Sequence, residues 1–209
     1  MDFEQAAWLA VRQVFPGATV KGCVFHFTQA VWRKVQEVGL KPAYSRRATI
    51  HNYIRQFLGL PFLPYTHIEP AFQELSSRAN SEPIHDLISY MEHQWMNHPI
   101  FTIESWSVYG LTIRTNNNCE GWHNKLNQKA GGLSLSFYRL VPVLQCEAEE
   151  VSYELRHLRD GISTRRVRPA ARKIEEKIRE LWKNYSAGNI QTSELLEGCA
   201  SAYGPQCEE

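Results

Sequence analysis

The sequence of 209 residues has no excess of charge, no long apolar run and few cysteines. Lysine and arginine number 23 against 22 aspartates and glutamates, so any polyanion-binding surface must come from local clustering. The five cysteines are an odd number at irregular spacing, which favours free thiols or one metal site over a disulfide framework. No apolar run approaches the roughly 20 residues that span a bilayer. We therefore expect no membrane partner.

The composition that remains is that of a globular chain. At 43% hydrophobic and 22% charged residues, it can bury a core of ordinary size as one domain, with a helical subdomain attached. The amino-terminal segment carries Asp2 and Glu4 where a secretory signal would carry lysine or arginine. The expected location is therefore the nucleus, with the cytosol as the alternative.

The first forty residues predict two helices around one strand. Apolar spacing predicts a helix over residues 3–14, with Asp2 as N-cap and Gln5 completing a variant of the capping box. Residues 19–25 are β-branched and aromatic, which predicts a short strand. This strand leads into a second helix over residues 28–40.

The rest of the chain is expected to be mainly helical. Residues 41–98 are typical of helices separated by proline-bearing turns, and residues 107–113 allow a second short strand. Long amphipathic helices are predicted over residues 137–161, with a proline near the first turn, and over residues 168–189. The chain after residue 193 has few constraints and is expected to be loose.

Glu120 lies in the stretch RTNNNCEGWHNKLN, residues 114–127. One interpretation is a helix cap, because Asn117 as N-cap and Glu120 three residues later satisfy the capping-box pattern. The other is chemical, because Asp2 is also expected at a helix start. Carboxylates at the ends of elements can converge on a divalent metal ion, and such ions drive phosphodiester chemistry.

Two Cys/His pairs could form a zinc site. Cys23 and His26 are three residues apart, and Cys119 and His123 are one helical turn apart. Together they would complete a Cys2His2 set if the two segments meet in space. The alternative is a buried thiol beside a hydrogen-bonded imidazole.

A basic cluster precedes and enters the last long predicted helix. Guanidinium groups of this kind suit phosphate contacts with DNA. The alternative is a solvated helix face, partly neutralised by two glutamates that follow. The cluster comprises Arg165, Arg166, Arg168, Arg172 and Lys173.

Taken together, residues 2–40 and 114–127 resemble the catalytic domain of Mutator-like element (MULE) transposases. The shared features are an acid-Phe-Glu segment, a helix ending in Phe-Pro-x-Ala, a Gly-Cys-x-Phe-His-Phe segment and, after a helical insertion, Asn-Asn-x-x-Glu-Gly-Trp-His-Asn. Their order matches over most of residues 2–127. Beyond Gly132 only the helical character is similar.

The resemblance implies an RNase H-like core in which three acids hold Mg²⁺ or Mn²⁺, cut DNA at transposon ends and join it elsewhere. Asp2 aligns with the second of these catalytic acids and Glu120 with the third. Cys23 and His26 align with a Cys-x-x-His element between the two acids. The residues that complete the motif around the glutamate are Asn116, Asn117, Trp122, His123 and Asn124.

The departure from the family is the first acid, which belongs to an early strand of the core, whereas this chain begins at the second. We therefore expect a fold that is mainly α with a small α/β remnant, a truncated RNase H-like core without DNA cleavage of its own. An incomplete sheet would also favour a homo-oligomer. The expected divisions are a partial core (1–40), a helical insertion forming its own layer (41–106), a return to the core (107–132), C-terminal helices (133–192) and a flexible tail (193–209).

Two other functional classes stay open. One is a non-catalytic DNA-binding or protein-interaction module derived from a transposase, whose DNA binding would depend on salt and survive loss of Glu120. The other is a small helical adaptor stabilised by zinc, which would lose its fold on chelation.

Overall fold

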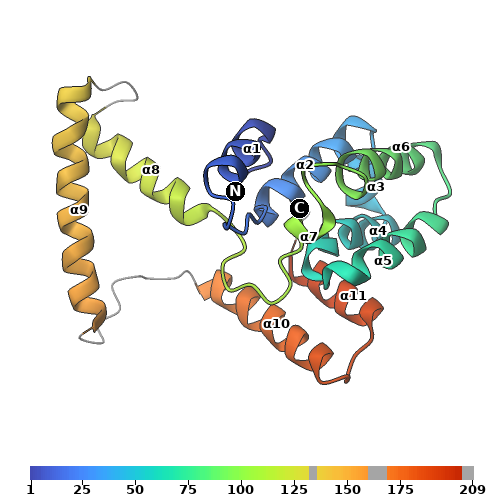
Figure 1. The fold of residues 1–209 in the computed structure, drawn as a ribbon. Helices are drawn as coiled ribbons and strands as arrows, with labels where there is room; N and C mark the ends of the chain where they lie inside the picture. The colour runs from blue at the N-terminus through green and yellow to red at the C-terminus, as the bar shows by residue number, and fades with distance from the viewer. Residues whose placement is uncertain (132–135, 160–168, 204–209) are drawn as a thin grey trace. The chain divides into compact units, whose positions relative to one another are not determined.

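A computed structural model describes residues 1–131, 136–159 and 169–203 (Figure 1). The chain is mainly helical, as expected, and these residues contain no strand. Two compact units are found: unit 1 comprises Met1–Thr115 and Lys173–Glu209, and unit 2 comprises Asn116–Arg172. The large unit is thus built from both ends of the chain, and the small unit from its central part.

Unit 1 is an assembly of helices. Most are short, and one of the connecting turns is a π-helical turn, η2. In chain order the elements are α1 (Gln5–Val14), α2 (Val24–Glu37), α3 (Lys41–Arg46), α4 (Ala48–Gly59), the 3-10 turn η1 (Leu60–Phe62), α5 (Tyr65–Ser77), α6 (Glu82–Met91), η2 (Glu92–Met96), α7 (Ile103–Trp106), α10 (Pro169–Ser186, which begins in unit 2) and α11 (Thr192–Ala202).

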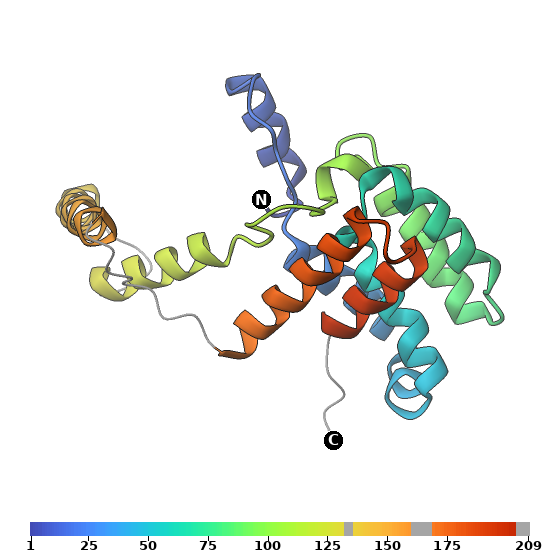
Figure 2. The same cartoon turned by 90° about the horizontal axis from the view of Figure 1, so that it is seen from below.

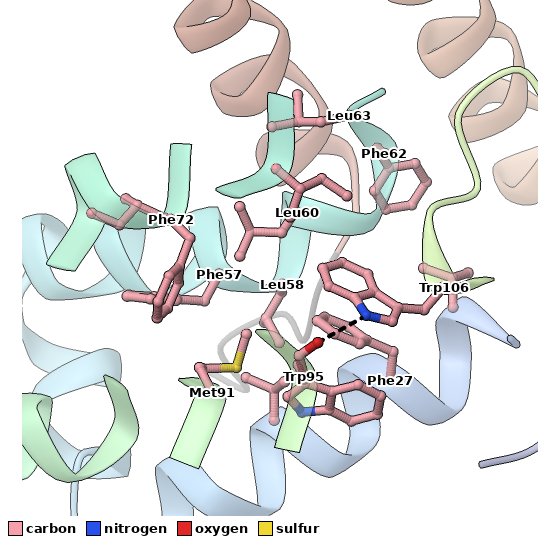
Figure 3. Packing of buried hydrophobic residues seen from close by; sticks show 14 of the residues in the cluster. Phe27, Phe57, Leu58, Leu60, Phe62, Leu63, Phe72, Met91, Trp95 and Trp106 are labelled. Carbon is pink, nitrogen blue, oxygen red and sulfur yellow. Dashed lines mark hydrogen bonds between the residues drawn. The ribbon is translucent and has the colours of Figure 1, made fainter. Parts of the chain in front are cut away.

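One aromatic-rich core joins these helices (Figure 3). Phe27 of α2 stacks on Trp106 of α7 with ring centroids 5.1 Å apart, and the Trp106 indole Nε1 donates a hydrogen bond to the Trp95 carbonyl oxygen at 3.2 Å. Leu58 and Phe62, from the middle of the chain, belong to the same cluster. The apolar side chains of residues 41–106 therefore share one core with those of residues 1–40.

The segment after residue 193, expected to be a loose tail, begins instead as part of α11. Leu195, Leu196 and Cys199 are buried, and α11 packs on α4. Helices α10 and α11 lie side by side (Figures 1 and 2), so close that a Cβ added at Gly198 would come within 2.7 Å of Leu181. The helix exists because its apolar residues recur at helical spacing and are buried on one face.

The two predicted strands are absent. Val24 already begins α2, and residues 107–113 form turns and irregular chain. Single backbone hydrogen bonds link these segments: the Gly22 N–H donates to the Ser105 oxygen at 2.8 Å, and the Val24 N–H donates to the Arg114 oxygen at 2.9 Å. Isolated bonds of this kind do not make a ladder, so the described residues show no remnant of a sheet.

Unit 2 is built around the helices α8 (Asn117–Ala130) and α9 (Phe137–Arg159), which pack against each other. Gly131 ends α8 in the left-handed conformation, with φ 71°, as the sequence predicts. Pro142 is the sixth residue of α9, beyond the first turn where it was expected. Among the described side chains of α8 and α9, Ala130 and Glu147 are the buried ones.

Candidate metal centre

Asp2 does not cap α1. The N-cap of that helix is Glu4, two residues later, and it makes no side-chain capping bond. The Asp2 backbone oxygen instead accepts a hydrogen bond from the indole Nε1 of buried Trp8 at 2.6 Å. The carboxylate faces α2, with Oδ1 3.1 Å from Nδ1 of His26.

The residues on either side of Asp2 anchor it. The Met1 amino group donates to the Lys21 oxygen at 2.7 Å, and the Met1 oxygen accepts from the Cys23 N–H at 2.8 Å. Met1 is thus hydrogen-bonded to both neighbours of Gly22. Phe3 packs over the same glycine, where an added Cβ would lie 2.4 Å from its ring. The backbone of residue 2 is therefore held on both sides.

His26 supplies the second polar group of this site. It lies in the first turn of α2, and its side chain is 23% exposed against 51% for that of Asp2. The pair borders an open groove of about 310 Å³, which Gln29 and Arg33 of α2 also line. The groove is thus accessible from solvent, and its lining includes the carboxylates of Asp2 and Glu4 beside the imidazole of His26.

The donor chemistry of this pair fits a divalent ion. Carboxylate oxygen suits Mg²⁺ and Mn²⁺, whereas imidazole nitrogen suits zinc and later transition metals. An oxygen and nitrogen pair therefore favours Mn²⁺ over Mg²⁺ within unit 1. Asp2 and His26 supply two donor atoms, so water or other groups must complete the coordination of such an ion.

Cys23 is buried, at 2% exposure, with a free thiol. It is the residue before α2, and its backbone N–H bonds to Met1 as described above. The imidazole Nδ1 of His26, three residues later, faces Asp2. The Cys2His2 zinc site thus stays a prediction; in unit 1 the contact of His26 is with a carboxylate.

Glu120 lies in the first turn of α8 in unit 2. The N-cap is Asn116, not Asn117, and it makes no side-chain capping bond, so the expected capping box is not formed. The Asn116 oxygen accepts backbone bonds from Cys119 at 2.8 Å and Glu120 at 3.1 Å, as in any helix start. A carboxylate at this end of a helix is favoured by the helix dipole.

The other members of the α8 motif face outward or toward α9. Cys119, His123 and Asn124 are exposed, and Trp122 donates its indole Nε1 to Glu147 of α9 at 3.2 Å. Glu147 was not predicted from the sequence as a partner of the motif. Its place next to the apolar face of the predicted helix over residues 137–161 was the one pattern in the sequence that could have indicated a contact with another helix.

A cluster of opposite charges joins α8 to α9. Lys129 contacts both Glu147 and Glu150, and Lys125 lies 2.8 Å from the Glu150 carboxylate. Hydrogen bonds from these two lysines lower the pKa of Glu150 to about 2. A hydrogen bond from Lys129, with the charge of Lys125 nearby, lowers the pKa of Glu147. The glutamates are therefore charged at neutral pH and neutralised within unit 2.

The predicted DNA-binding cluster is described only in part. Arg165, Arg166 and Arg168 lie outside the described residues, whereas Arg172 and Lys173 are exposed in the first turn and a half of α10. Arg114 was not predicted as a site residue; it is a buried cation that contacts Glu175 of α10 and lies 5.3 Å from the Trp182 ring. Its backbone oxygen holds the start of α2, so it supports the element that carries His26.

Compared with protein-family models, with curated proteins and with solved structures, the chain matches none. Among the described residues, no helix is long and apolar enough to cross a membrane.

Proposed function

We propose that this chain carries part of the metal-dependent catalytic region of a MULE-type DNA transposase, with Asp2 and Glu120 as two of its acids. The motifs in residues 2–40 and 114–127 support this proposal. The observation that carries it is the Asp2 carboxylate, anchored through Met1 and Phe3 and held 3.1 Å from His26 at the edge of an open groove. An aspartate that only capped a helix would require neither the anchoring by Met1 and Phe3 nor the contact with His26.

A divalent ion bound here would polarise a DNA phosphate and activate the attacking water. Asp2 would bind this ion through its carboxylate, and His26 would orient that carboxylate or bind beside it. The resemblance assigns the role of a further metal-binding carboxylate to Glu120, in the first turn of α8 in unit 2. Arg33, which lines the groove, offers a positive charge to the DNA backbone.

We expect no strand cleavage by this chain by itself. The family's reaction uses three acids, and two carboxylates do not readily position the two metal ions of an in-line displacement. The proposed role of Asp2 and Glu120 is therefore metal binding within a larger catalytic centre. Nicking of DNA by the purified chain with Mg²⁺ or Mn²⁺, abolished by Glu120→Gln, would show that the chain is active by itself.

Metal binding tests the proposal directly. We expect the full chain to bind Mn²⁺ in a calorimetric or electron-paramagnetic titration, and Asp2→Asn to weaken binding by about tenfold or more. Asp86→Asn is the matched control, because Asp86 is an exposed aspartate of α6 away from the groove. Binding that is unchanged by Asp2→Asn, or weakened equally by Asp86→Asn, would remove the support for a metal centre.

The exposure of Arg172 and Lys173 favours a second candidate, a non-catalytic DNA-binding module. Binding to a DNA duplex would then fall steeply with salt and survive Asp2→Asn. Replacing both basic residues by glutamate would weaken it, whereas the same change at Lys183, later in α10, would do so far less. Tight DNA binding that requires Mn²⁺ would favour the first candidate.

A further inference from the structure

Two arginines lie at the junction of α3 and α4, in the stretch Arg46-Arg47-Ala48-Thr49. This is the one place in the sequence where two successive arginines are followed, after one intervening residue, by a hydroxyl side chain. Protein kinases select their substrates by charge pattern, and a kinase with an acidic substrate groove prefers arginines two and three residues before the acceptor hydroxyl. The stretch therefore has the charge pattern of a phosphorylation site at Thr49.

All four residues of this stretch are exposed. The side chains that anchor this part of unit 1 lie outside the stretch, because Tyr44 before it and Ile54 after it are buried. Among the described residues, no ion pair involves Arg46 or Arg47. The two guanidinium groups and the Thr49 hydroxyl are therefore all accessible to a second protein.

The segment around the stretch carries charge of one sign. Between Glu37 and Glu69 the sequence contains no aspartate or glutamate, and Lys41 adds a third positive charge five residues before Arg46. An acidic substrate groove would therefore meet no like charge from this segment. The charge of the segment is the one that an arginine-selecting kinase attracts.

The backbone of the stretch can become extended by the opening of a single helical turn. Arg47 is already extended, with φ −123° and ψ 107°, and is the N-cap of α4 without a side-chain capping bond. The first N–H groups of a helix have no intrahelical acceptor. The bond from the His51 N–H to the Arg47 oxygen, at 2.9 Å, is therefore the first that holds α4. Opening this first turn presents Thr49 in the extended form that a kinase groove binds.

We propose that Thr49 is phosphorylated by an arginine-selecting protein kinase, independently of the metal centre. The Thr49 hydroxyl oxygen forms a bond to the γ-phosphorus of ATP, the bond from that phosphorus to the departing ADP oxygen breaks, and the hydroxyl proton passes to the catalytic aspartate of the kinase. The product carries about two negative charges in the first turn of α4, where the helix end favours an anion. Arginine also pairs well with phosphate, so phosphorylation should stabilise the start of α4.

Incubation of the full chain with ATP, Mg²⁺ and the catalytic subunit of cyclic-AMP-dependent protein kinase, which selects arginines at these two positions, tests the proposal. We expect intact mass to show one added phosphoryl group and peptide mass spectrometry to place it on Thr49. Thr66 is the internal control: it is also exposed and also the second residue of its helix, α5, but it follows Leu63 and Pro64 in place of arginines. An unmodified Thr49, or equal modification of Thr66, would overturn the proposal.

Variants separate recognition by charge from accessibility of the hydroxyl. Arg46→Gln combined with Arg47→Gln keeps the Thr49 hydroxyl and changes exposed residues, so it should leave the fold intact and slow phosphorylation about tenfold or more. An unchanged rate in this double variant would overturn recognition by the arginines. In the phosphorylated wild type, amide exchange at the start of α4, referenced to that of α5, should slow about threefold. Unchanged exchange would overturn the stabilising role of the phosphate.

Discussion

The two units reach order by different physical means. In unit 1, Trp8, Trp95 and Trp106 are almost wholly buried in one apolar cluster. In unit 2, Ala130 is the one buried apolar residue among the described side chains of α8 and α9, and the helices are joined by charge pairs around Glu147. Apolar burial is insensitive to salt and mild acid, whereas exposed ion pairs are sensitive to both. The four predictions below probe this contrast.

The largest effect is expected in the aromatic core. Trp106→Ala should lower the free energy of unfolding by about 3–5 kcal/mol, because it opens a cavity beside Phe27 and Trp95. Urea denaturation of the full chain measures this loss. Tyr138→Ala, in α9 and 86% exposed, removes a similar ring and should cost less than about 0.5 kcal/mol. Equal losses would remove the contrast between the units.

The next effect concerns the buried cation of unit 1. The Arg114 side chain is 6% exposed and its partner Glu175 is 43% exposed. Glu175→Gln leaves the guanidinium buried with a neutral partner, at a cost of about 2 kcal/mol. The exposed Glu180 of the same helix is the control, and Glu180→Gln should change stability by less than about 0.5 kcal/mol. An unchanged free energy of unfolding in Glu175→Gln would mean that water already forms the hydrogen bonds that the Arg114 guanidinium needs.

A smaller effect on stability is expected at two glycines, Gly121 within α8 and Gly131 directly after it. Gly131 has φ 71°, so Gly131→Ala should destabilise unit 2 by about 1 kcal/mol. Gly121 lies inside the helix with nothing near its added Cβ, so Gly121→Ala should stabilise α8 by about 0.5–1 kcal/mol. Helix-specific amide exchange would show opposite shifts. If both substitutions changed the amide exchange rates of α8 in the same direction, the helix would not end at Gly131.

The smallest effect at neutral pH is that of the charge cluster. Because the pKa of Glu150 falls from its ordinary 4.5 to about 2 on folding, its contribution is complete above pH 4.5 and is lost as the pH falls toward about 2. Amide exchange in α9, referenced to that of α4, should therefore quicken across this window and in about 1 M salt at pH 7. Glu150→Gln should reduce this acid response, and the part that is left belongs to Glu147, whose pKa is also lowered. If Glu150→Gln kept the full change in α9 amide exchange with pH, titratable groups other than Glu150 would be its cause.

Local patterns predicted the helices better than their ends. The helices over residues 137–161 and 168–189 and the left-handed Gly131 are confirmed as α9, α10 and the end of α8. Caps were misplaced by one or two residues, since several adjacent polar side chains satisfy the same pattern. The strand at residues 19–25 failed because β-branched residues do not form a strand without a neighbouring ladder.

The candidate site was predictable as residues but not as contacts. Asp2 and His26 were both named from the sequence, yet their pairing depends on Met1 lying along residues 21–23, which no local pattern encodes. Arg114 was missed because a lone arginine carries no sign of burial. Its partner is 61 residues away.

The tryptophans give the two units separate optical identities. Trp122 is the single tryptophan of unit 2, partly exposed and bonded to a carboxylate, whereas Trp8, Trp95 and Trp106 of unit 1 are shielded from water. Emission near the blue end of the indole range should therefore come from unit 1. A soluble quencher should reach Trp122 first and then Trp32, the partly exposed tryptophan of unit 1. In Trp32→Phe, the intrinsic fluorescence would report on each unit in turn.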